Sequence, residues 1–385
     1  MQAYRKIDLY NRYIGEQSTE ALQTGCISSE SNNKILTAYP SKLYTPNYFI
    51  RIALGLLTMV AVLFSGLLLS LLSSASGATT IKAVMIFLAI LCYITLELLV
   101  KSKQYYNAGV DSVLMIMVIG FVAGTFFISD FETYWLAMSS VVMVLALWMS
   151  TRFTDAFMAI ISYCCLFIFL FLLYLKAGNI AKATAPLMMM IVSTLVYFMM
   201  KKLIDSKTFM YRFCFKAVTF LTLITFYASG NYFIVKELSN QMFHLQLSLN
   251  DPIPMAWLFW ILTLIIPPAY IIYGILKKNF LVMRTGLGLI AATIFTIKYY
   301  YAILPAEIEM FIAGIILIAL GYALIKYLAT PKYGFTSLDL YPSKKEILNA
   351  EALIIAETFN KQSGIENDGL YGGGSGGGGG ATGEY

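Results

Sequence analysis

The sequence predicts an all-α membrane protein: a polytopic bundle of about ten transmembrane helices with both termini on the cytoplasmic side. The prediction rests on composition, on the length of the apolar runs and on where the basic residues fall. The 385-residue chain is 59% hydrophobic and 12% charged, and its mean hydropathy is +0.73. Such a chain has too little polar surface to cover a soluble globule of its size.

The apolar runs define the expected spans. Roughly 20 apolar residues cross about 30 Å of hydrocarbon as a helix. Because the opening residues are polar and charged, the first run has no signal-peptide pattern and is expected to act as an uncleaved anchor. Runs of the required length lie near residues 50–72, 82–100, 109–128, 133–150, 156–175, 184–200, 211–231, 254–276, 280–302 and 307–328.

The basic residues predict the orientation. With the N-terminus inside, all but five of the 27 Lys and Arg residues fall in cytoplasmic segments, where short loops of inserted proteins concentrate them. The five on the outside are Lys82, Lys176, Lys182, Lys236 and Lys298. Anionic lipid head groups are sufficient partners for the net charge of +6, so membrane lipids are expected partners and nucleic acid is not.

Polar segments flank the bundle and predict the domain organisation. Residues 17–37 read as two short helices joined at Gly25, with Ser28 as the cap of the second. After Pro331, Ser343 can cap a helix that runs to about Gln362 and is followed by a Gly-rich stretch. The predicted parts are a cytoplasmic helical hairpin (1–47), the ten-span bundle (48–329), a cytoplasmic linker and amphipathic helix (330–362) and a disordered Gly-rich tail (363–385).

One group of apolar runs is interrupted in a way that suggests a groove. Pro267 and Pro268 fall near the centre of the eighth span, where each ring removes a backbone donor and leaves carbonyls of the preceding turn without partners. Hydroxyl side chains recur at helical spacing on the seventh and ninth spans and either line a path or bond their own helices. The candidate groove consists of Pro267, Pro268, Thr222, Thr225, Ser229, Thr293 and Thr296.

The sequence offers little for catalysis. His244 is its one histidine, no cysteine pair has zinc spacing, and no nucleotide-binding or nucleophile-elbow motif occurs. The charges within the spans lie near span ends, where snorkelling explains them, and Glu97 stands four residues before Lys101 at ion-pair spacing. The sequence therefore favours a protein without enzymatic activity and predicts no catalytic residue, cofactor or metal.

The N-terminal hairpin carries a family resemblance. Leu22, Gly25, Ile27, Ser28 and Glu30 match the pattern L-x-x-G-x-I-[ST]-x-E, although Ser31 stands where a Gln is usual. This segment resembles that of an uncharacterised family of bacterial multi-pass membrane proteins, which carry it before the first span. The resemblance implies residence in the bacterial inner membrane and assigns no residue roles.

Two functions of different classes are compatible with the sequence. The first is a permease-like or lipid-handling bundle with its groove near the seventh to ninth spans. The alternative is a non-catalytic membrane scaffold or sensor that meets a cytoplasmic protein through its N-terminal hairpin and its C-terminal helix and tail. The candidate docking residues of the C-terminal helix and tail are Leu353, Ile354, Phe359 and Tyr385.

Overall fold

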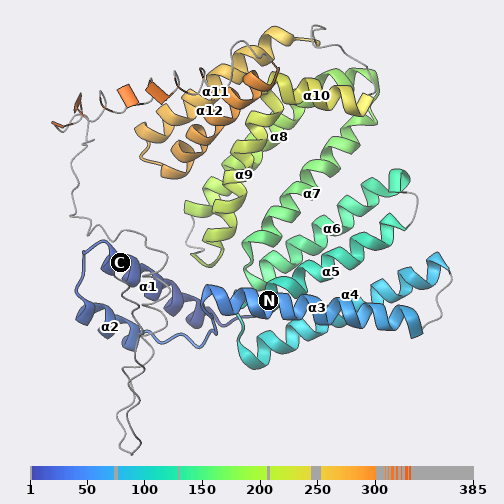
Figure 1. The fold of residues 1–385 in the computed structure, drawn as a ribbon, viewed down its shortest axis with the longest axis vertical. Coiled ribbons are helices and arrows are strands. Elements are labelled where there is room, and N and C mark those ends of the chain that lie inside the picture. Colours follow the sequence, from blue (N-terminus) through green and yellow to red (C-terminus); the bar gives the residue numbers. More distant parts are fainter. Residues whose placement is uncertain are drawn as a thin grey trace, which may run out of the picture. The chain divides into compact units, whose positions relative to one another are not determined.

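A computed structural model describes residues 2–72, 77–128, 131–205, 209–243 and 253–300, together with isolated positions between 308 and 330. In this part of the chain the regular elements are helical, and one parallel bridge joins Tyr44 to Tyr105, which confirms the all-α class (Figure 1). The helices are α1 (Lys6–Gln23), α2 (Ser29–Ala38), α3 (Tyr48–Leu72), α4 (Ala78–Lys103), α5 (Val110–Phe127), α6 (Phe131–Phe153), α7 (Ala156–Leu175), α8 (Asn179–Asp205), the short 3-10 helix η1 (Phe209–Tyr211), α9 (Arg212–Gly230), α10 (Tyr232–Phe243), α11 (Ala256–Leu276) and α12 (Phe280–Tyr300).

Within the described residues, nine helices are long and apolar enough to cross a membrane, namely α3 to α9, α11 and α12. They confirm the first nine predicted spans and a multi-pass membrane protein. Most of the tenth predicted span, 307–328, lies outside the described residues, as does His244. The chain divides into two units, Met1–Gly314 and Ile315–Tyr385, and the helices named above belong to the first.

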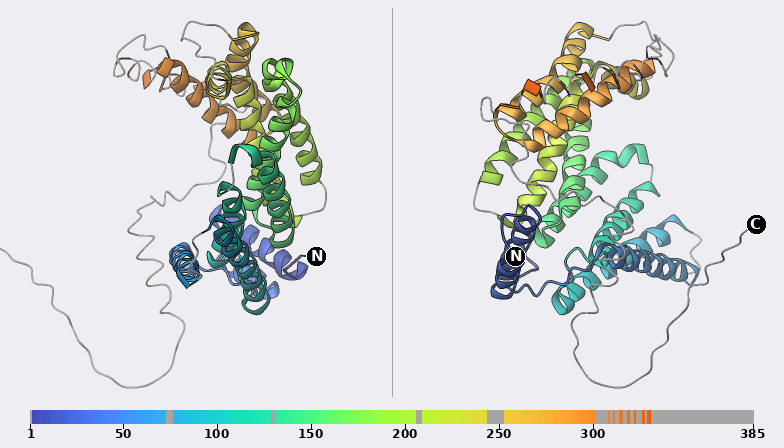
Figure 2. Two further views of the ribbon diagram at one scale, coloured as in Figure 1. Left: turned by 90° about the vertical axis from the view of Figure 1, so that its right-hand side faces the viewer. Right: turned by 60° about the vertical axis from the view of Figure 1, so that its left-hand side comes forward.

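Helices that follow one another in sequence form the main packing pairs: α4 with α5, α6 with α7, α8 with α9, and α11 with α12. Helix α7 also packs on α9, so it joins the group formed by α3 to α6 to the group formed by α8 to α12 (Figures 1 and 2). Helix α9 contacts α7, α8, α10, α11 and α12 and is therefore the central helix of the second group.

Close helix approach occurs at particular glycines. A Cβ on Gly274 of α11 would lie 2.6 Å from the backbone nitrogen of Met283, and a Cβ on Gly286 of α12 would lie 3.0 Å from the carbonyl oxygen of Pro267. Only glycine permits α11 and α12 to pack this closely. A Cβ on Gly288, four residues before Ala292, would meet no other described part of the chain within 4 Å, so this pair of small residues does not mark the contact.

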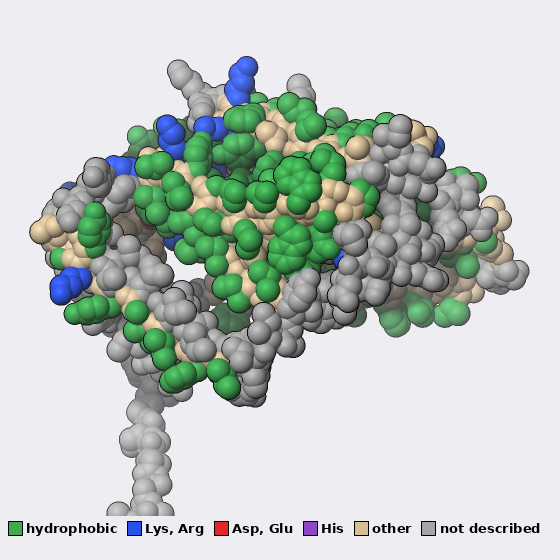
Figure 3. Space-filling view, turned by 90° about the horizontal axis from the view of Figure 1, so that it is seen from above, with side chains coloured by type: hydrophobic (Ala, Val, Ile, Leu, Met, Phe, Trp, Pro, Cys, Tyr) green, Lys and Arg blue, Asp and Glu red, His purple; other side chains and the backbone are tan. Residues whose placement is uncertain are grey.

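Much of the surface of the spanning helices is apolar. Within the described part of the chain, helix α3 packs mainly on α4 and α5, and Leu57, Phe64 and Leu71 are more than 60% exposed along it. Figure 3 shows one face of the protein on which hydrophobic side chains predominate and Lys and Arg lie toward the edge. Lipid tails would solvate these side chains without cost, as expected for spans that face the bilayer.

The N-terminal hairpin is longer than the sequence predicts, because α1 begins at Lys6. Its turn is as expected: Gly25 has φ +73°, and the Ser28 hydroxyl accepts a hydrogen bond from the backbone N–H of Ser31. A buried 2.6 Å hydrogen bond from Ser18 to Asn32 joins the two helices. The hairpin also docks on the bundle, since Leu9 belongs to the core formed by α4, α5 and α6.

Candidate functional site

The threonines of the predicted groove bond within and between helices. Thr222 donates to the carbonyl of Thr219 at 2.7 Å, and Thr225 shares a 2.6 Å hydrogen bond with Tyr163 of α7. On α12, Thr293 shares a 2.6 Å hydrogen bond with Tyr227 of α9. Thr296 donates to the carbonyl of Ala292, and Ser229 is half-buried in α9. Two of these hydroxyls therefore lie at helix contacts, Thr225 between α7 and α9 and Thr293 between α9 and α12, whereas Thr222 and Thr296 bond within their own helices.

Helix α11 continues through both prolines of that predicted groove. Pro267 is fully buried, and its carbonyl faces Gly286 of α12, whereas Pro268 is exposed. The structure therefore places the two prolines on different sides of α11. Neither of the two cavities described below is lined by any residue of the predicted groove.

The connection between α9 and α11 differs from the sequence prediction. Residues 232–243 form the helix α10, where the sequence predicts only a loop between the seventh and eighth spans. The fully buried Asn231 explains the helix: its Oδ1 accepts hydrogen bonds from the N–H groups of Phe233 and Ile234, and its Nδ2 donates to Tyr227. An Asn at this position thus accepts hydrogen bonds from backbone N–H groups in the first turn of α10 that have no partner within the helix.

The predicted C-terminal docking residues, Leu353, Ile354, Phe359 and Tyr385, lie outside the described residues. The site that the structure does build lies at the other polar end, where residues 2–45 meet the ends of several spans. The Ala3 N–H donates to the Arg152 carbonyl at 2.9 Å, at the end of α6. The Tyr4 hydroxyl donates to the Tyr105 carbonyl at 2.7 Å, between α4 and α5.

A cluster of aromatic rings and one cation fixes this end. The rings of Tyr4 and Tyr106 meet edge to face with centroids 5.1 Å apart, and the Arg12 guanidinium lies 4.5 Å above the Tyr106 ring. Burial raises the pKa of the Tyr4 hydroxyl, and the nearby Asp111 raises it further. Burial likewise raises the pKa of Tyr106. Both phenols therefore stay neutral hydrogen-bonding groups under physiological conditions.

Two carboxylates near the cluster lie at the starts of helices, Asp111 in the first turn of α5 and Asp155 at the N-cap of α7. Asp111 is 4% exposed and accepts a 2.9 Å hydrogen bond from the Ala108 N–H. It lies in the first turn of α5, so the snorkelling expected from its place near a span end does not occur. Asp155 is the N-cap of α7 and accepts a 2.8 Å hydrogen bond from the Met158 N–H. Burial raises the pKa of Asp155, and the charge of Asp111 adds to that rise.

The carboxylate of Glu97 forms an ion pair that differs from the predicted one. Its partner is Arg152 of α6, which binds both carboxylate oxygens through Nε and Nη2, the latter at 2.9 Å. The Tyr93 hydroxyl donates to Glu97 at 3.0 Å, and the indole N–H of Trp148 donates to Tyr93 at 3.1 Å. The network therefore joins α4 to α6. The sequence spacing instead predicted an ion pair of Glu97 with Lys101 on the same helix.

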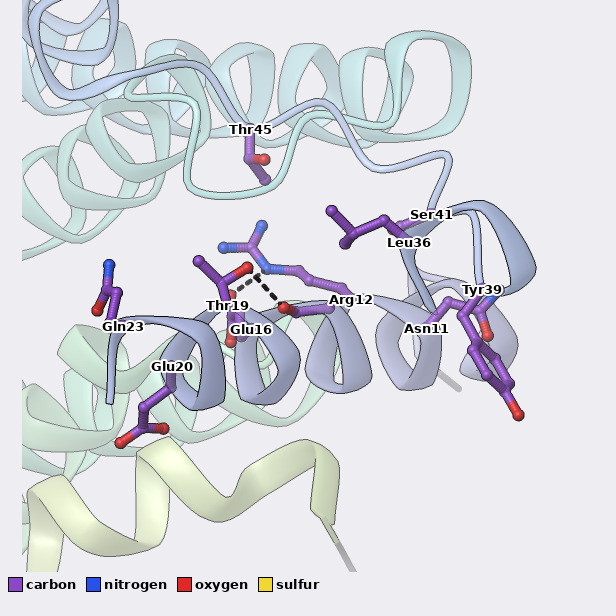
Figure 4. Close-up of a pocket in the computed structure, with 11 residues that line it drawn as sticks. Asn11, Arg12, Glu16, Thr19, Glu20, Gln23, Leu36, Tyr39, Ser41 and Thr45 are labelled. Atoms are coloured by element: carbon purple, nitrogen blue, oxygen red, sulfur yellow. Dashed lines mark hydrogen bonds and ion pairs between the residues drawn. The ribbon is translucent and has the colours of Figure 1, made fainter. Parts of the chain in front are cut away.

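An open groove of about 480 Å³ lies between α1, α2 and the segment that follows them. Figure 4 shows Arg12 and Glu16 joined on the α1 side, Leu36 and Thr45 across from them, and Gln23 and Tyr39 toward opposite ends. Arg12 Nε lies 2.8 Å from Glu16 Oε1. The lining residues are Asn11, Arg12, Gly15, Glu16, Thr19, Glu20, Gln23, Leu36, Tyr39, Ser41 and Thr45.

Arg12 connects this groove to the bundle, because the same side chain lines the groove and covers Tyr106. The sequence offered one signal for this arrangement, the amphipathic hairpin itself, and none for the pairing of Arg12 with an aromatic ring 94 positions away in the chain, which is a tertiary contact. Among the described residues, no group of three or more His, Cys, Asp and Glu side chains could hold a metal ion.

Comparison with known proteins gives no match: no family model, no curated protein and no solved structure matches the chain. The resemblance of the N-terminal hairpin to a bacterial membrane protein family therefore stays a prediction.

Proposed function

We propose that this multi-pass membrane protein is a scaffold or sensor whose N-terminal hairpin receives a soluble protein partner. The observation that carries the proposal is the groove between α1 and α2, which is open, lined by both polar and apolar side chains, and connected to the spans through Arg12. The predicted orientation places this groove in the cytoplasm. A second docking element of the proposal is the C-terminal helix and tail, with Leu353, Ile354, Phe359 and Tyr385.

The attachment of the hairpin supports a sensing role. Arg212, at the start of α9, donates to the Tyr13 hydroxyl at 2.9 Å, and the Tyr10 ring packs edge to face on Phe209 of η1 at 5.4 Å. Together with the bond from Ala3 to α6, these contacts join the hairpin to several spans. A partner that shifts α1 would therefore act on the ends of α6 and α9 directly.

Photocrosslinking in living cells tests the proposal. A photoreactive amino acid at Thr19, which lines the groove, should give a crosslinked product of discrete mass with a partner protein. The same substitution at Asn33, an exposed residue of α2 outside the groove, is the matched control. Gly15→Leu should abolish the Thr19 product, because even a Cβ there would lie 3.2 Å from Leu36. Equal products from Thr19 and Asn33, or a Thr19 product that survives Gly15→Leu, would contradict the proposal.

A permease-like or lipid-handling function near α9, α11 and α12 is the second candidate. Buried polar side chains between α9 and α12 favour it: Asn231, Tyr227 and Thr293 form a chain of hydrogen bonds that runs from the junction of α9 and α10 to α12. Solute or lipid flux in proteoliposomes, compared between the wild type and Thr293→Val, tests it. Flux that Thr293→Val leaves unchanged, or no flux at all, would exclude this role for the chain.

A further inference from the structure

A second cavity, of about 610 Å³, lies where the extreme N-terminus meets the end of α6. This volume is within the range of about 300–1,000 Å³ that is typical of small-ligand sites. Its described lining comes from three segments that are distant in sequence, since η1 contributes as well as the N-terminus and α6. The lining residues are Gln2, Tyr4, Lys6, Trp148, Thr151, Arg152, Met210 and Tyr211.

The charge of this cavity is one-sided. Lys6 and Arg152 are cations, and the described lining contains no carboxylate. The Glu97 carboxylate, outside the lining, binds the Arg152 guanidinium through both oxygens, so it fixes Arg152 and offsets its charge, and Lys6 supplies the excess positive charge of the cavity. The nearest acid in sequence to Lys6, Asp8, is buried and paired with Arg5 at 2.9 Å, so it does not neutralise Lys6. The cavity therefore favours an anion.

The polar wall opposite the cations is preorganised. The Tyr211 hydroxyl donates to the Thr151 carbonyl at 2.8 Å and accepts from Gln2 Nε2 at 3.1 Å. These bonds join η1 to the end of α6 and to the N-terminal segment. A ligand that enters the cavity would therefore meet side chains already fixed in place, which lowers the entropy cost of binding.

The depth of the cavity indicates which anion. Trp148 and Arg152 belong to the last turns of the span Tyr134–Phe153, so the cavity lies at the level where that span leaves the hydrocarbon. Trp148 is 51% exposed, and with Met210 it adds apolar surface beside the cations. Tryptophan at a span end is typical of the head-group layer, where anionic phospholipids present a phosphate diester next to apolar chains.

We infer that this cavity binds the phosphate-bearing head group of one anionic phospholipid. The phosphate would lie at Lys6, beside the ion pair of Arg152 with Glu97, and the glycerol and upper acyl region would lie against Trp148 and Met210. The inference is independent of the protein partner proposed for the α1–α2 groove, because it concerns a different cavity. A bound lipid would also hold residues 2–6 against α6 and so stabilise the docked position of the hairpin.

Native mass spectrometry of the full-length protein in detergent tests this inference, with phosphatidylglycerol, phosphatidylcholine and inorganic phosphate titrated separately. Phosphatidylglycerol should bind at least about 5-fold more tightly than phosphatidylcholine, and Lys6→Gln should weaken its binding by about 5-fold. That factor corresponds to about 1 kcal/mol for each basic residue near an anionic lipid surface. Lys6 is exposed and Lys6→Gln leaves every interaction described above intact, so the variant is expected to fold.

Lys42→Gln is the matched control, because Lys42 is an exposed lysine of the same polar segment outside the cavity lining. It should change phosphatidylglycerol binding by less than about 2-fold, well short of the effect of about 1 kcal/mol at Lys6. Equal weakening by the two variants would reduce the effect to general surface charge and overturn the inference. Equal binding of phosphatidylcholine would overturn it as well, and so would inorganic phosphate that binds as tightly as phosphatidylglycerol, since the site would then recognise a free anion.

Discussion

Gly109 is the residue at which adding a single methyl group should most reduce the stability of the bundle. It precedes α5 with φ +93° and ψ −41°, and a Cβ there would lie 2.1 Å from the carbonyl oxygen of Arg51 on α3. The same Cβ would lie 3.2 Å from the backbone nitrogen of Gly55. Because both neighbours are backbone atoms, no side-chain rotation relieves the clash, and α3 and α5 must separate.

We expect Gly109→Ala to lower the free energy of unfolding by about 2–5 kcal/mol. The positive φ accounts for about 1–2 kcal/mol, and the forced separation of packed helices accounts for about 1–3 kcal/mol. Reversible unfolding in mixed detergent micelles, followed by circular dichroism, measures the change. Gly120→Ala is the matched control in the same helix, because a Cβ there would lie more than 4 Å from the other described elements. Gly109→Ala within about 0.5 kcal/mol of the wild type would refute the reasoning, since surface changes of no structural consequence fall in that range.

Three further predictions concern polar contacts. Burial raises the pKa of Asp155 above the usual value of about 3.9. The folded state therefore binds this proton more tightly than the unfolded state, so the protonated carboxyl favours folding at low pH, and this contribution is lost as the pH rises through the raised pKa. Asp155→Asn keeps a cap for α7 and should flatten the dependence of the melting temperature on pH; an unchanged dependence would contradict this. Asn231→Ala should cost about 2–4 kcal/mol through its lost buried hydrogen bonds, whereas Asn33→Ala on the exposed face of α2 should cost less than about 0.5 kcal/mol in the same unfolding measurement. A double-mutant cycle of Glu97→Gln and Arg152→Gln should give a coupling of about 1 kcal/mol, because water reaches part of the pair; a coupling of zero would mean that the ion pair is not maintained.

The spans were predictable because the bilayer imposes a length and a polarity on each of them. The predicted range 156–175 matches α7 residue for residue, while the predicted ranges 82–100 and 184–200 stop short of α4 and α8. Those two helices continue through polar turns at both ends, such as Asn179 and Asp205 of α8, where hydropathy falls although the backbone hydrogen bonds continue.

The candidate site was far less predictable, because its contacts join residues that are distant in sequence. Glu97 has Lys101 at helical spacing, yet Arg152 lies close enough to bind both of its carboxylate oxygens once α4 and α6 pack. Asp111 lies near a span end in the sequence, where a charge is expected to reach the head-group layer. In the fold it is buried and lies close enough to Tyr4 of the N-terminal segment to raise the pKa of that hydroxyl. Helix α10 escaped prediction because the Asn231 cap that starts it directly follows the last residue of a span.

The bond between Ala3 and Arg152 also has a consequence for biosynthesis. The partners of Tyr4, Ala3 and Gln2 are Tyr105, Arg152 and Tyr211, so Gln2 waits for its partner until the ribosome has made η1. At a synthesis rate of about 5–20 residues per second this wait lasts roughly 10–40 s. During that time several spans are already inserted, and the hairpin closes onto them afterwards. Residues 2–4 thus complete their contacts only after the helices up to η1 have been made, and before α9 to α12 follow.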